Sequence, residues 1–147
     1  MRRILPPAWL AISLVVMAGL HFLVPIARLV PEPWSYAGIA LIVGGIALSA
    51  VGAGAFRRAG TPVVPFERST VLVTTGLYRV TRNPMYLGLA TALTGTAIAF
   101  GTLSPWLPIP VFLWILSTQF IRGEEAFLEE IFGADYVAYK KKVRRWI

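Results

Sequence analysis

The sequence predicts an all-α integral membrane protein, a bundle of about four transmembrane helices followed by a cytosolic helical tail. Apolar residues make up 56% of the 147 positions, and they fall in long runs separated by charged segments. Charged residues make up only 14%, whereas a soluble domain usually has about 25%. Such segregation is typical of a chain whose solvent is a bilayer. The length predicts a single domain, residues 1–147.

Four apolar stretches are candidates for spanning helices, each of which needs about 20 residues. They cover approximately residues 8–30, 34–56, 85–103 and 106–121, and the last of them is short. Irregular backbone is too costly in lipid, so these stretches are expected to be helical. Small residues recur every four positions in the second and third stretches, which predicts close helix packing there. The positions are Gly45, Ser49, Ala53, Gly88, Ala92 and Thr96.

The basic residues predict the orientation in the membrane. Of the 14 Lys and Arg residues, 13 lie on one side of a four-span arrangement: Arg2 and Arg3, the connection 57–84, and the segment after residue 121. The other side has only Arg28. The positive-inside rule makes the basic side cytosolic and places both termini there. The net charge of +7 therefore predicts contact with anionic membrane lipids, not with nucleic acid.

The polar residues exclude several kinds of function. The chain has no cysteine, which excludes a disulfide, a thiolate metal site and a cysteine nucleophile. His21 is the only histidine and no carboxylate cluster accompanies it, so no metal site is expected. None of the acidic residues lies within a predicted span. A proton-coupled pump normally needs an ionisable group at that depth, so this function is disfavoured.

The tail from Arg122 onward is the most charged part of the chain and is predicted to be helical. Residues 122–132 form an amphipathic pattern, Gly133 is a plausible break, and a second short helix is expected from Ala134. Glu124 and Glu125 are adjacent at the predicted membrane surface. Two acids beside anionic lipid are unfavourable unless a cationic group lies near them, which indicates that these residues have a partner.

A second polar cluster lies where the long inner connection enters the third span. Asn83 and Pro84 suit the cap and the first position of a helix. This role does not explain the two tyrosines and two arginines within nine residues of the same interface. They are Tyr78, Arg79, Arg82 and Tyr86.

These two clusters together resemble the core of the isoprenylcysteine carboxyl methyltransferases, and phospholipid N-methyltransferases have a related pattern. The resemblance is carried by residues 72–78, by Arg82-Asn83-Pro84-Met85-Tyr86-Leu87-Gly88, and by Glu124-Glu125 followed by Phe132-Gly133, Tyr136, Tyr139 and a basic end. It covers approximately residues 61–147. The N-terminal half matches only in being apolar.

The resemblance implies S-adenosylmethionine as cofactor, bound at the cytosolic ends of the helices by segments 61–88 and 120–147. It implies methyl transfer to a lipophilic or membrane-embedded small-molecule acceptor. The residues implied to bind the cofactor are Thr70, Val71, Leu72, Val73, Tyr78, Asn83, Pro84, Met85, Tyr86 and Glu124.

The chain departs from the family pattern at two positions. Asn83 stands where many members have histidine, and Phe120 stands where the prenylcysteine enzymes have an arginine that binds the substrate carboxylate. The catalytic candidates are Glu125, the nearest possible base, and Arg122, the arginine nearest to Phe120. The sequence leaves open whether the acceptor atom is oxygen, nitrogen or sulfur. The alternative function is a non-catalytic small membrane protein, an assembly factor or a transporter.

Overall fold

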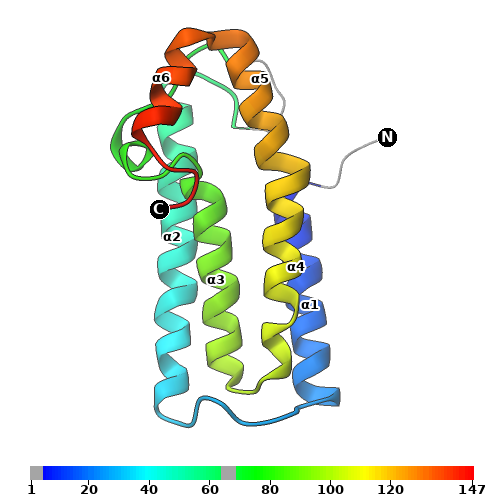
Figure 1. The fold of residues 1–147 in the computed structure, drawn as a ribbon. Coiled ribbons are helices and arrows are strands. Elements are labelled where there is room, and N and C mark those ends of the chain that lie inside the picture. The colour runs from blue at the N-terminus through cyan, green and yellow to red at the C-terminus, as the bar shows by residue number, and fades with distance from the viewer. Residues whose placement is uncertain (1–4, 64–68) are drawn as a thin grey trace.

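The computed structural model describes residues 5–63 and 69–147, and over these ranges the chain forms a helical bundle with no extended strand (Figure 1). Three of the arginines that predict the orientation lie outside the described residues: Arg2, Arg3 and Arg68. Part of the predicted site segment 61–88 lies outside them as well.

Within these two ranges, six α-helices follow one another. They are α1 (Pro6–Leu23), α2 (Ala37–Arg58), α3 (Pro84–Phe100), α4 (Pro108–Ile115), α5 (Arg122–Phe132) and α6 (Ala134–Lys142). Short 3-10 turns precede α2, α3 and α4: η1 (Trp34–Tyr36), η2 (Gly76–Arg79) and η3 (Ser104–Trp106). A π-helical turn, η4 (Leu116–Ile121), joins α4 to α5.

The lengths and surfaces of the helices confirm a multi-pass membrane bundle. Within the described ranges, Pro6–Leu23, Trp34–Arg58 and Ser104–Phe132 are long and apolar enough to span a bilayer, and the apolar α3 is shorter, with 17 residues. Only 11% of the spanning window is buried in each of the first two helices, so their apolar faces are left for lipid. The predicted bundle of four helices is therefore confirmed.

Helices α2 and α3 run antiparallel and touch through glycines. A Cβ atom on Gly45 would lie 2.5 Å from the carbonyl oxygen of Gly88, and one on Gly38 would lie 2.3 Å from that of Gly95. The partner atoms are backbone, so they cannot move aside. Without a hydrophobic driving force between helices in lipid, such close backbone contact is a main source of association. The predicted packing role of Gly45 and Gly88 is confirmed.

The first helix ends at Leu23, seven residues before the predicted end at Val30. Pro25 explains the early end, because proline has no N–H to continue the helix and disfavours helical backbone at the residue before it. The chain then pairs with the connection between α3 and α4. The N–H groups of Leu29 and Val30 donate to the carbonyl oxygen of Gly101, at 2.8 and 3.0 Å.

The fourth helix extends beyond the predicted span. Instead of a short span that ends near Ile121, one helical rod runs from Ser104 through η4 and α5 to Phe132. The predicted break at Gly133 is confirmed, with a φ of 50° that glycine tolerates best, and α6 follows it.

The end of the bundle where α5 and α6 lie, hereafter the site end, also contains the last turn of α2, the first turn of α3 and the segment 69–83 (Figure 1). Helix α6 buries Tyr136 and Tyr139 together with Val143. Leu72 from the connection and Leu128 from α5 pack against them. These contacts hold the two sequence segments of the predicted site side by side.

Candidate active site

A cavity of about 60 Å³ lies at the site end, and we call it the polar cavity. Its walls come from α2, the segment 69–83, the first turn of α3, α5 and α6. It is lined by Phe56, Ser69, Val71, Leu72, Val73, Tyr78, Arg82, Asn83, Met85, Tyr86, Glu124, Glu125, Leu128, Tyr136 and Tyr139.

Most of the residues predicted for the site line this one cavity. They are Val71, Leu72, Val73, Tyr78, Asn83, Met85, Tyr86, Glu124 and Glu125. Three others do not line it. Thr70 is exposed, and its N–H donates to Thr61 Oγ1 at 3.0 Å. Pro84 is fully buried at the start of α3, and Arg122 is exposed on α5.

Glu124 is connected directly to α3. The Tyr86 hydroxyl donates a hydrogen bond of 2.5 Å to Glu124 Oε1. Tyr86 is in the first turn of α3, where Pro84 occupies the first helical position and so costs no intrahelical hydrogen bond. The contact fixes one carboxylate oxygen in the wall of the polar cavity.

Glu125 lies between two guanidinium groups. Arg145 donates to it twice, from Nε to Oε1 at 3.0 Å and from Nη2 to Oε2 at 2.6 Å. Nη1 of Arg82 lies 2.9 Å from Glu125 Oε1. The cationic partner expected for the adjacent acids is therefore present. Both oxygens are already engaged, which favours a holding role for Glu125 over the predicted role of proton acceptor.

Arg82 is largely buried and is only partly paired within the described residues. Its side chain is only 12% exposed. Nε and Nη1 make no well-directed hydrogen bond to any of the residues 5–63 and 69–147, although Nη1 forms the ion pair with Glu125. Buried donors without a partner are costly and usually mark a place for a ligand or an ordered water. Arg82 belongs to the quoted motif, but the sequence did not show that it lines the cavity.

Asn83 holds the segment that follows α6, residues 143–146, hereafter the strap. Its Nδ2 donates to the carbonyl oxygen of Arg145 at 2.9 Å. The Arg82 N–H donates to the carbonyl oxygen of Arg144 at 3.0 Å, and the Thr81 hydroxyl donates to that of Arg145 at 3.3 Å. The Asn83 amide is thus engaged with the protein's own backbone, while the residue still borders the polar cavity.

Three phenols line the polar cavity outside the spanning segments: Tyr78, Tyr136 and Tyr139. Burial raises the pKa of Tyr136 to about 12, and it also raises the pKa values of Tyr78 and Tyr139. All three are therefore neutral near pH 7. The Tyr139 hydroxyl donates to the carbonyl oxygen of Tyr78 at 2.7 Å, which ties α6 to η2. Tyr136 and Tyr139 were not predicted to line the site, although their spacing of three residues indicates one helix face.

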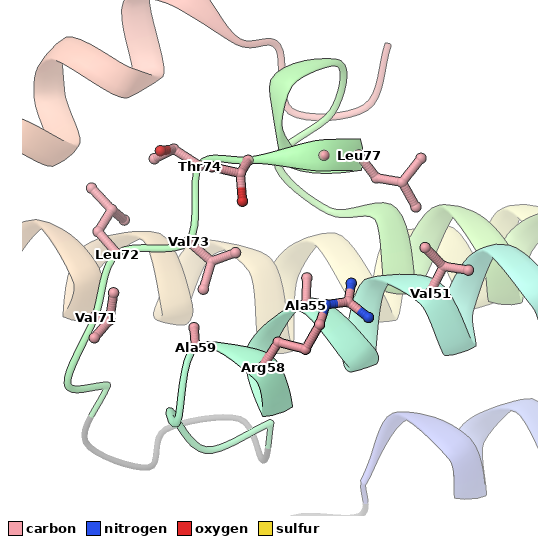
Figure 2. Close-up of a pocket in the computed structure, with 11 residues that line it drawn as sticks. Val51, Ala55, Arg58, Ala59, Val71, Leu72, Val73, Thr74 and Leu77 are labelled. Atoms are coloured by element: carbon pink, nitrogen blue, oxygen red, sulfur yellow. The ribbon is translucent and has the colours of Figure 1, made fainter.

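A larger cavity of about 340 Å³ is also lined by Val71, Leu72 and Val73, and we call it the outer cavity. Figure 2 shows these three residues on one extended segment, with Arg58 on the last turn of α2 across from it. The same three residues line the polar cavity. The segment 71–73 is therefore a wall that the polar cavity and the outer cavity share.

Residues 34–135 match the phospholipid methyltransferase family. A protein-S-isoprenylcysteine O-methyltransferase of Schizosaccharomyces pombe is 38% identical over 77 residues, which are 52% of this chain and 33% of the relative. The Saccharomyces cerevisiae protein of that name is 41% identical over 80 residues, 52% of this chain and 32% of the relative.

A probable protein-S-isoprenylcysteine O-methyltransferase of Oryza sativa subsp. indica is 29% identical over 116 residues, 76% of this chain and 61% of the relative. The chain spans about a third of the length of the two yeast relatives. The family match covers more than half of the chain and includes α2, α3, α4 and α5. This chain therefore belongs to the phospholipid methyltransferase family.

Proposed function

We propose that the chain is an S-adenosylmethionine-dependent methyltransferase that binds its cofactor in the polar cavity and methylates a lipophilic acceptor. One observation carries the proposal. The two distant segments that resemble the methyltransferases converge on one cavity, which has a carboxylate, a guanidinium whose Nε has no partner among the described residues, and several aromatic rings. Family membership supports the reaction class.

The side chains fit the chemistry of this cofactor. The Glu124 carboxylate can accept hydrogen bonds from the ribose hydroxyls. Arg82 can donate to the methionine carboxylate through Nε, which has no hydrogen-bond partner among the described residues. Aromatic and apolar residues supply walls for the adenine, and an aromatic face also attracts a sulfonium cation. The wall residues are Phe56, Leu72, Tyr78, Leu128, Tyr136 and Tyr139.

The volume of the polar cavity is smaller than this ligand requires. Its 60 Å³ leave room for a few water molecules, whereas pockets for small ligands are usually about 300–1,000 Å³. The outer cavity of about 340 Å³ is lined by the same Val71, Leu72 and Val73. We infer that this segment moves toward the outer cavity when the cofactor binds, so that the two spaces together reach the required size.

The bound cofactor supplies a methyl group on a positively charged sulfur, which a nucleophilic acceptor atom can attack. The protein's task is to align the acceptor with that methyl group and to exclude water. The neutral phenols and the engaged Glu125 offer no ready proton acceptor. This favours an acceptor that is already ionised, a carboxylate or a thiolate. The O-methyltransferase names of the relatives are consistent with a carboxylate.

We propose that the site end is cytosolic. The basic residues of the described chain gather there, at the end of α2, in the segment before α3 and after α5. They include Arg57, Arg58, Arg79, Arg82, Lys140, Lys141, Lys142, Arg144 and Arg145. By the positive-inside rule these residues stay in the cytosol, where the cofactor is available.

Cofactor binding by the detergent-purified protein tests the proposal. S-adenosylmethionine or its demethylated product is expected to raise the melting temperature. A ligand at a hundred times its dissociation constant stabilises the folded state by about 2.7 kcal/mol. Arg82→Lys is expected to reduce the shift, because lysine cannot form a bidentate pair. No shift at millimolar cofactor, with the protein shown to be folded, would favour the non-catalytic alternative.

A further inference from the structure

A third cavity, of about 390 Å³, lies among α2, α3 and α4, and we call it the lateral groove. Leu41, Leu87 and Leu113 contribute apolar walls from the three helices. Trp146 of the strap lines it as well. Its volume lies in the usual range for a small-ligand pocket, about 300–1,000 Å³.

The hydroxyl groups of the lateral groove on α3 are already satisfied. Thr91 Oγ1 donates to the carbonyl oxygen of Leu87 at 2.8 Å, and Thr94 Oγ1 donates to that of Ala90 at 2.9 Å. Each bond is made to the preceding turn of the same helix, so these donors are not turned to an occupant. The groove therefore suits an apolar chain more than a polar head.

Trp146 is the residue that connects the lateral groove with the polar cavity. The side chain of its neighbour Arg145 binds Glu125, which lines the polar cavity. Trp146 itself packs against the core of the bundle and lines the groove. Two adjacent residues of the strap therefore contact different sites. Arg145 binds a residue of the polar cavity, and Trp146 lines the lateral groove. The bonds from Thr81 and Asn83 to the Arg145 carbonyl group fix the backbone from which Trp146 extends.

We propose that Trp146 determines the specificity for the acceptor, by setting how large an apolar chain the lateral groove holds. The inference rests on the proposed function and adds the residue that selects the acceptor. The occupant is the apolar chain of the acceptor, because the groove is apolar and the strap joins it to the cofactor-binding wall. A smaller side chain at position 146 enlarges the groove, because Trp146 is part of its wall.

The first test compares methyl transfer to N-acetyl-S-geranyl-, S-farnesyl- and S-geranylgeranylcysteine. Trp146→Ala is expected to raise the kcat/KM ratio of the geranylgeranyl over the geranyl compound about tenfold or more, because one methylene in an apolar pocket is worth about 10–200-fold. Trp146→Phe is expected to give a smaller rise and serves if the alanine variant fails to fold.

Trp106→Ala is the matched control. Trp106 packs against the same core but does not line the lateral groove. The Trp106→Ala variant loses an indole of the same size. Its kcat/KM ratio of the geranylgeranyl over the geranyl compound is expected to equal that of the wild type. If Trp146→Ala and Trp106→Ala change the ratio equally, or if neither changes it, the inference is wrong although the methyltransferase activity stands.

The second test does not require methyl transfer. The chain has no cysteine, so Thr91→Cys introduces the only thiol, and it does so in the lateral groove. The ratio of its labelling rate by dodecylmaleimide to its labelling rate by methylmaleimide is expected to change several-fold when Trp146→Ala is added. An unchanged ratio overturns the inference, even if the wild type methylates no acceptor. If phospholipid protects the thiol but the S-prenylcysteines do not, the groove is assigned to bilayer lipid. This result also overturns the inference.

Discussion

The hydroxyl group of Tyr86 donates a 2.5 Å hydrogen bond to Glu124, and this contact links the first turn of α3 to α5. The two residues come from the two halves of the sequence pattern. The phenol orients the carboxylate before any ligand arrives, so a ligand that uses the second oxygen finds it in place. Such preorganisation lowers the cost of binding.

Glu124→Gln keeps the shape of the side chain and removes its charge. If the carboxylate accepts hydrogen bonds from the ribose, cofactor binding should weaken by about 1.5–3 kcal/mol, the range for hydrogen bonds to charged groups. Calorimetric titration of cofactor into the purified variant measures this. Glu130→Gln is the matched control, since Glu130 is exposed on α5 and does not line the polar cavity. Equal affinity for Glu124→Gln and the wild type would remove the assigned role.

Glu125→Ala should destabilise the fold. The change leaves Arg82, with a side chain 12% exposed, without its carboxylate partner, and it frees the strap from α5. A buried charge left without its partner typically costs about 3–5 kcal/mol. Arg145 is 38% exposed and can turn to water, so the cost comes from Arg82, and we expect about 3 kcal/mol, the lower end of this range.

Denaturation in mixed micelles measures this loss. Glu130→Ala removes an exposed acid of the same helix and should change the unfolding free energy by less than about 0.5 kcal/mol. If the two variants are equally stable, Glu125 does not hold the strap.

Gly45→Ala should separate α2 from α3. The new methyl group would lie 2.5 Å from the carbonyl oxygen of Gly88, and backbone cannot yield as a side chain can. Overpacking of this kind costs about 1–3 kcal/mol. The neighbouring Gly44→Ala is the matched control, because nothing lies within 4 Å of its Cβ position. The unfolding free energy in mixed micelles should be clearly lower for Gly45→Ala than for Gly44→Ala. The reverse order would contradict the packing of α2 against α3.

Single cysteines test the orientation in intact cells. Ser69 and Lys141 lie at the site end, whereas Glu32 lies in the connection between α1 and α2 at the opposite end. An impermeant thiol reagent added outside should label Glu32→Cys and spare Ser69→Cys and Lys141→Cys. Labelling of either residue from outside would place the site end outside the cell.

The fold could be predicted largely because the bilayer allows few alternatives. Apolar runs had to be helices, and the spacing of Gly45 and Gly88 indicated where two of them touch. The ends of the helices were harder to predict. Pro25 stops α1 early in an apolar run, while η4 continues the fourth helix past Ile121 without a break. Local hydropathy does not show the first of these ends. It does place the change from apolar to charged residues at Ile121, but the helix itself does not end there.

The site could be predicted only in part. The motifs supplied Tyr86 and Glu124, which the structure brings together. They did not supply the second partner of Glu125, Arg145, because it is 20 residues away and reaches Glu125 only after the turn at Gly133. Arg122 is the opposite case. Closeness in sequence suggested a role at the site, but the residue is exposed and does not line the polar cavity.

The wall formed by Val71, Leu72 and Val73 belongs to two cavities at once. If this segment moves as proposed, any molecule that wedges into the outer cavity opposes the movement that admits a ligand to the polar cavity. Binding at the two places is then antagonistic, and linkage requires the antagonism to be mutual and equal in free energy. A compound directed at the outer cavity beside Arg58 would weaken cofactor binding without touching Glu124 or Arg82.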